Sequence, residues 1–179
     1  MKKIFALVAT LLLGAALAAC GGTGRAEQPH THNNEPQVNT RPTAGNHSFN
    51  FGGVSITMGA EPGPIVAALG EPLNESREPN CAIEGEDVAL AYPGIIVTLT
   101  YPADGGAPFI TGVRLLDDSV STPEGLYIGA DPAEIARLYG QADREENGFY
   151  YFNKGRSTLE IAVRNGVVSQ IIYQYLFME

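Results

Sequence analysis

This chain of 179 residues has no histidine after His47. Histidine is the commonest general base of enzymes and a frequent zinc ligand. The sequence also lacks the Gly-x-Ser-x-Gly, His-Glu-x-x-His and glycine-rich phosphate-binding motifs. His30 and His32 have no third ligand near them and are interpreted as solvated. We therefore expect a protein that is not an enzyme, with no catalytic residue, no cofactor and no metal.

Cysteine is also scarce, since Cys20 and Cys81 are the 2 cysteines of the chain. Cys20 ends an apolar N-terminal run and is a candidate for modification. Its modification would leave Cys81 without a partner and would exclude an intramolecular disulfide. No later histidine is present to activate Cys81 as a nucleophile. We interpret Cys81 as a buried or tolerated thiol, and a dimer-forming or reactive cysteine is the alternative.

Basic residues are outnumbered by acidic ones, 11 against 20, which gives a formal net charge of −9. Such a surface repels the phosphates of nucleic acids and the headgroups of anionic lipids. We expect no nucleic-acid partner, and any attachment to a membrane must depend on something other than a basic patch.

The N-terminus has a strong pattern that suits such an attachment. Two lysines precede an apolar run over residues 4–16, which is shorter than the roughly 20 residues of a membrane-spanning helix. The sequence LAAC at 17–20 resembles the lipobox of bacterial lipoproteins. The resemblance implies removal of a signal peptide (1–19) and attachment of diacylglycerol to Cys20. The acyl chains, palmitate among them, would then hold the protein on the extracytoplasmic face of the cell membrane, or of the outer membrane where the host has one. An ordinary signal peptide with an incidental cysteine is the alternative.

Residues 20–48 consist mainly of Gly, Pro, Asn, Thr, Gln and Glu, with hardly an aliphatic side chain. Such a composition cannot bury enough apolar surface to offset chain entropy. We predict a lipidated, disordered tether over 20–48. About 130 residues remain, which is enough for one domain or two small fused modules.

The remaining part contains an internal repeat. Gly59-Ala60-Glu61-Pro62 recurs as Gly129-Ala130-Asp131-Pro132, and Gly70 recurs as Gly140. An acidic residue before a proline favours the start of a helix, and a glycine favours its end. Each copy therefore predicts a helix of about eight residues, which is too short to be stable without a covering layer.

Strands are predicted after each helix. Apolar residues alternate over 95–101 and 157–163, and Asn165-Gly166 is typical of a hairpin turn. Each repeat is predicted to contain a short lead strand, a helix and a three- to four-stranded antiparallel meander. The predicted fold class is α+β, a tandem of repeat 1 (49–118) and repeat 2 (119–179), with room for one continuous curved sheet.

Two acidic stretches are interpreted as surface connections. Residues 74–87 are predicted to form a polar loop and residues 143–148 a turn. Glu84, Glu86 and Asp87 form the densest acidic cluster, and calcium binding is the alternative to a solvated loop. Their spacing matches no loop in which oxygen ligands converge, so we favour the solvated loop.

The G-x-[D/E]-P start, the short helix that ends in Leu-Gly or Tyr-Gly, and the strands after it resemble the module of the outer-membrane assembly lipoproteins of the BamE/SmpA family. Two such modules in tandem resemble the β-lactamase inhibitory protein family, whose repeats form one curved sheet with a concave binding face. The chain departs from both, because BamE-like proteins have one module and the inhibitors are braced by disulfides. The resemblance implies a lipoprotein that binds another protein.

Aromatic and polar side chains favour a binding surface on the predicted sheet. If the helices cover one face, the other face gains a polar-aromatic surface, because tyrosines offer large, stiff contact area. Core packing of the rings is the alternative.

The leading hypothesis is a non-enzymatic module that binds an envelope or secreted protein. The alternatives are a lipoprotein that binds a small ligand, such as a peptide or sugar, and a carboxylate-based wall hydrolase. The predicted binding residues are Tyr150, Glu160, Arg114, Gln170 and Gln174.

Overall fold

The computed structural model describes residues 45–80 and 82–177. Several of the predictions made above concern positions outside the described residues. These are the signal peptide, most of the tether, Cys20, His30, His32 and Cys81.

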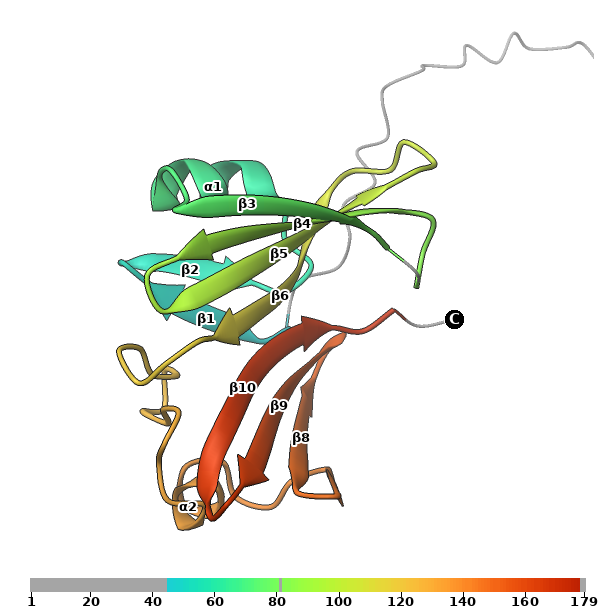
Figure 1. Cartoon of the computed structure of the whole chain (residues 1–179). Helices are drawn as coiled ribbons and strands as arrows, with labels where there is room; N and C mark the ends of the chain where they lie inside the picture. The colour runs from blue at the N-terminus through green and yellow to red at the C-terminus, as the bar shows by residue number, and fades with distance from the viewer. Residues whose placement is uncertain (1–44, 81, 178–179) are drawn as a thin grey trace, which may run out of the picture. The chain divides into compact units, whose positions relative to one another are not determined.

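The described chain contains ten strands and two helices (Figure 1). The helices are α1 (Pro62–Leu69) and α2 (Ala133–Tyr139). β1 (Ser48–Phe51) and β2 (Val54–Thr57) pair with each other as a separate hairpin. The other eight strands form one antiparallel sheet in the order β3-β4-β5-β6-β10-β9-β8-β7. They are β3 (Asn74–Pro79), β4 (Gly85–Tyr92), β5 (Ile95–Pro102), β6 (Phe109–Leu115), β7 (Arg144–Glu146), β8 (Phe149–Lys154), β9 (Ser157–Arg164) and β10 (Val167–Tyr175).

The predicted α+β fold class, a tandem of helix-on-meander modules, is wrong. About 48% of the described residues lie in strands and 11% in helices, so the chain is mainly β. β6 pairs with β10, with Val113 opposite Tyr173, and this pairing makes a single eight-stranded sheet the main element of the fold. The lead strand predicted for the second repeat is also missing, since no strand lies between Leu115 and α2.

The sequence also fails to predict two strands. β3 lies where a polar loop is predicted, and β7 lies where a turn is predicted. Both are edge strands of the sheet, and every residue in them is exposed. Because neither face of these strands is buried, their sequences show no alternation of apolar and polar residues, which is the signal by which a strand is recognised.

One face of the sheet carries the core. A row of buried side chains in register crosses six strands, and both helices pack on this side of the sheet. Val66 of α1 packs against the core, and the ring of Tyr139 in α2 lies 5.1 Å from that of Phe152. The row consists of Leu90, Val97, Val113, Tyr173, Leu159 and Phe152.

The β1-β2 hairpin belongs to the same core. Phe49 and Ile56 are fully buried, and the ring of Phe49 lies 5.6 Å from that of Tyr173. His47 is hydrogen-bonded through Nε2 to the Phe152 carbonyl oxygen at 2.8 Å, and Asn46 accepts a hydrogen bond from the Arg156 amide at 2.8 Å. The folded part therefore begins earlier than residue 49, and the end of the predicted tether requires this correction.

The repeated Gly-Ala pairs occupy similar local positions. The Gly59 amide donates to the Ile110 carbonyl at 2.7 Å, and the Gly129 amide donates to the Val168 carbonyl at 2.7 Å. The environments differ in packing. A Cβ on Gly59, which has a φ of +83°, would lie 2.6 Å from the ring of Tyr175, whereas a Cβ on Gly129 would meet nothing within 4 Å. Glycine is thus required sterically at the first position.

Candidate functional site

The second face of the sheet carries no helix among the described residues. Because successive side chains of a strand point to opposite faces, the strand register defines which residues share this side. We call it the open face. One row of its residues crosses all eight strands and consists of Asn74, Ala91, Ile96, Arg114, Ile172, Glu160, Tyr151 and Arg144.

Four of the five predicted binding residues lie on the open face. Arg114 and Glu160 belong to the row just described, and Gln174 lies opposite Gly112. The side-chain amide of Gln170 donates to the Glu160 carboxylate at 2.9 Å, so these two are in contact. The structure thus brings together, on one face, residues from β6, β9 and β10.

Tyr150 does not belong to this group, and its assignment is corrected. It lies opposite Ile161, a fully buried residue of the core face. Its neighbours Phe149 and Tyr151 point the other way and lie on the open face. Sequence reasoning missed these two rings, although the register of the β8-β9 hairpin relative to the buried residues Leu159 and Ile161 could have placed them.

Phe149 and Tyr151 form an aromatic surface with arginines at its ends, which we call the ring ladder. The two rings are stacked at a centroid distance of 6.3 Å with an interplanar angle of 22°. The guanidinium of Arg144 lies 3.9 Å from the centroid of Tyr151, and that of Arg164 lies 5.5 Å from the centroid of Phe149. Cation–π contacts of this kind hold rings in place at a surface, so the ladder presents stiff contact area.

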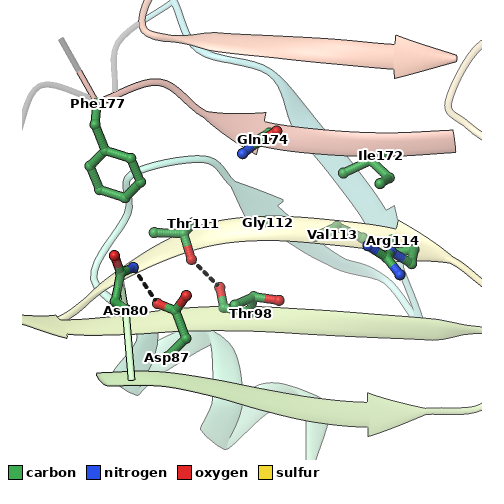
Figure 2. Close-up of a pocket in the computed structure, with 10 residues that line it drawn as sticks. All are labelled: Asn80, Asp87, Thr98, Thr111, Gly112, Val113, Arg114, Ile172, Gln174 and Phe177. Atoms are coloured by element: carbon green, nitrogen blue, oxygen red, sulfur yellow. Dashed lines mark hydrogen bonds between the residues drawn. The ribbon is translucent and has the colours of Figure 1, made fainter. Parts of the chain in front are cut away.

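A cavity of about 200 Å³ opens on the same face where β5 and β6 meet β10. We call it the seam cavity (Figure 2). Small residues explain the hollow, because Ala89 and Gly112 lie in one register row beside Thr98. Its lining residues are Asn80, Asp87, Thr98, Thr111, Gly112, Val113, Arg114, Ile172, Gln174 and Phe177.

One end of the seam cavity carries a carboxylate held by hydrogen bonds. Asp87 Oδ1 accepts from the Asn80 side-chain amide at 2.8 Å and from the Thr100 hydroxyl at 2.6 Å. The Thr111 hydroxyl lies 3.0 Å from that of Thr100 and donates to the Thr98 carbonyl oxygen at 3.2 Å. Since Thr100 is fully buried, this network fixes the position of the carboxylate.

The other end of the seam cavity carries a cation. The side chain of Arg114 lines the cavity and makes no hydrogen bond or ion pair with a residue in the described ranges. Its register partners are Ile96 and Ile172, which offer no charge. Arg114 and Asp87 therefore give the cavity ends of opposite sign.

The acidic cluster named in the sequence is divided between the two faces. Glu86 pairs with Arg77 at 2.7 Å, whereas its neighbour Asp87 points into the seam cavity. Within residues 45–80 and 82–177, no group of three or more His, Cys, Asp and Glu side chains is arranged to hold a metal ion. Asp87 is the one carboxylate among the described lining residues of the cavity.

Comparisons of the chain with protein-family models, curated proteins and solved structures find no match. In the part of the chain that the structure describes, neither helix has the length and apolar character to cross a bilayer.

Proposed function

We propose that this protein is a lipoprotein of the bacterial cell envelope that binds another protein through the open face. The observation that carries the proposal is a sheet face that extends across eight strands without a helix on it. Its part-buried rings, arginine and amide side chains are of the types enriched in protein interfaces.

The edges of the sheet favour binding by the face and oppose binding by strand addition. β3 carries Glu75, Arg77 and Glu78 and ends at Pro79, and β7 has the sequence Arg-Glu-Glu. Charged side chains and proline on an edge strand oppose pairing with a further strand. A partner is therefore expected to contact side chains of the open face.

A small-ligand-binding lipoprotein is the second candidate, because the open face contains the seam cavity. The volume of this cavity, about 200 Å³, is however below the roughly 300 to 1,000 Å³ of most small-molecule sites. A cavity of this size suits one or two side chains of a larger partner. We therefore place protein binding first.

The lipid anchor of the proposal is Cys20. Two acyl chains give the stable membrane attachment that a single chain does not, and the acidic composition of the protein leaves the chains as the means of attachment. Metabolic labelling with palmitate and membrane fractionation test the anchor. Cys20→Ala is expected to lose the label and move the protein to the soluble fraction; a labelled Cys20→Ala protein contradicts the anchor.

Photo-crosslinking in the native envelope tests the docking face. A photoreactive residue is introduced at Tyr151 or Gln174 on the open face, and at Ala67 or Arg137 on the helices as matched controls. We expect one defined crosslinked protein from the first two positions and none from the controls. Equal crosslinking from both pairs, or crosslinking from the helices alone, contradicts the assignment of the open face.

A further inference from the structure

We propose that the seam cavity recognises an extended segment of the protein partner by its charges, with a cationic side chain at the Asp87 end and a carboxylate at the Arg114 end. The inference rests on the proposed function and adds the chemical character of the partner. It follows from what each end of the cavity offers and from the distance between them.

The Asp87 end is suited to an ammonium or guanidinium group. Oδ1 of Asp87 accepts both of the hydrogen bonds described above, which leaves Oδ2 without a donor among the described residues. Glu78 lies opposite Asp87 in the register and adds a second negative charge on the same face. The ring of Phe177 and the Thr98 hydroxyl also line the cavity, and they offer a cation–π surface and an oxygen acceptor.

The Arg114 end is suited to a carboxylate. Its guanidinium can form two parallel hydrogen bonds to a carboxylate, which is the preferred geometry for this pair. Glu160 lies two strands across the sheet from Arg114 in the same register row, and it accepts a hydrogen bond from Gln170. Arg114 is thus available to a partner.

The two ends are separated by the length of a short extended peptide. Arg114 lies opposite Ile96 on β5, and Asp87 lies opposite Thr100 on the same strand. Four residues along a strand and two strands across the sheet place the two Cα atoms about 16 Å apart. Residues i and i+4 of an extended segment have Cα atoms about 13 Å apart, and their side chains can span the difference.

Gly112 leaves room for the backbone of such a segment. It lies between the two ends of the cavity, and a Cβ there would lie 3.4 Å from the Tyr173 carbonyl oxygen and 3.8 Å from Thr98 Cβ. Its position is therefore compatible with a side chain, but a large one would fill the cavity. Substitution of Gly112 tests the cavity with little change to the sheet.

Blocked pentapeptides are the probes of this inference. N-acetylated, C-amidated Lys-Ala-Ala-Ala-Glu and Glu-Ala-Ala-Ala-Lys are titrated separately into the ¹⁵N-labelled protein, and Gln-Ala-Ala-Ala-Gln is the neutral control. We expect one charged peptide to shift the amide signals of Gly112 and Thr98 with a Kd of about 1 mM or below, and the neutral peptide to bind at least about tenfold more weakly. The preferred order of the charges gives the direction of the segment.

Variants assign the two ends. Asp87→Asn and Arg114→Gln are each expected to weaken the preferred peptide about tenfold, because each removes one charged contact. Arg137→Gln on α2 and Asp104→Asn are matched controls outside the cavity and away from the open face, and they should leave binding unchanged. Arg114→Glu is expected to bind Lys-Ala-Ala-Ala-Lys in preference, and Gly112→Val to lose all peptide binding while keeping a folded spectrum.

Equal binding of charged and neutral peptides would overturn the inference. The absence of any shift in the amide signals of Gly112 and Thr98 at peptide concentrations up to about 10 mM would also overturn it. The crosslinking experiment separates this failure from that of the proposed function. A crosslink that persists at Tyr151 in the Asp87→Asn and Arg114→Gln variants, together with no peptide binding, refutes the charged segment and leaves the docking face standing.

Discussion

The two halves of the open face share a backbone register but differ in the size of their side chains. On β4 to β6 the face carries small residues, Ala89, Ala91 and Gly112, and it is hollowed into the seam cavity. On β8 the corresponding positions carry Phe149 and Tyr151, and the face is covered by the ring ladder. Strand pairing therefore builds one continuous sheet, and side-chain volume decides whether a region of its open face is hollow or covered by rings.

The largest expected effect tests whether the halves are one folding unit. Leu90→Ala in β4 and Leu159→Ala in β9 each remove a nearly fully buried side chain from the same core row. Each is expected to lower the free energy of unfolding by about 2 to 5 kcal/mol. Because the row is continuous, denaturant unfolding should remain a single transition, and hydrogen exchange should accelerate in both halves for either variant.

The control for this prediction is Leu73→Ala, since Leu73 is 75% exposed and its truncation should have little effect. If Leu90→Ala accelerated exchange in β3 to β6 and left β7 to β10 protected, the two halves would be separate units.

The next largest effect on stability is expected from the loss of a buried hydroxyl, and it should differ between Thr100 in β5 and Thr158 in β9. Thr100→Val removes a donor to Asp87 and leaves part of the carboxylate's hydrogen bonding unmet, which is expected to cost about 1 to 3 kcal/mol. Thr158 is also buried, but its hydrogen bond to the Phe152 carbonyl oxygen is long, at 3.4 Å. Thr158→Val is therefore expected to cost less, and equal losses in chemical denaturation of the two variants would contradict the network around Asp87.

Removal of the ring ladder is expected to affect binding more than folding. Tyr151→Ala loses the stack with Phe149 and the contact with Arg144, together worth about 1 kcal/mol of stability. Capture of the crosslinked partner should fall at least tenfold, since aromatic anchors carry much of the energy of an interface. Tyr151→Phe keeps the ring and should retain both, as quantified by thermal unfolding and crosslink yield.

The smallest expected effect is on the pH dependence of stability, and it concerns the hydrogen bond between His47 and the Phe152 carbonyl oxygen of β8. Burial lowers the pKa of His47 below its ordinary 6.5. The folded protein therefore keeps His47 neutral as the pH falls, while the unfolded chain takes up a proton, so stability present above about pH 6.5 declines below it. Unfolding free energies between about pH 7.5 and 5 should decrease in the native protein, and the decrease should be smaller in His47→Gln. If the free energy of unfolding fell equally with pH in the native protein and in His47→Gln, the role assigned to His47 would be wrong.

The sequence predicts the local signals of the fold better than the sheet that they build. The helices follow the proline and glycine signals near Glu61 and Gly140, and the Asn165-Gly166 turn closes the β9-β10 hairpin. The pairing of β6 with β10 joins residues about 60 positions apart, and no local pattern specifies it. The edge strands escape prediction for a related reason, since their exposed side chains leave no apolar period.

The candidate site shows the same division. Arg114, Glu160 and Gln174 could be placed together because they alternate with apolar residues in their strands. Tyr150 could not, because a run of four aromatic residues in β8 has no polar member to mark the outer side. The seam cavity depends on a register across four strands, and the role of Asp87 becomes visible when that register is known.

The position of β10 at the centre of the sheet has a consequence for biosynthesis. Residues 167–175 are added to the chain after β6 and β9, yet they pair with both of these strands. Until they are complete, β6 is an unprotected edge with a strongly apolar sequence, which is a hazard for aggregation. A product truncated at the β9-β10 turn would expose the edge of β6 permanently, so completion of the sheet depends on β10.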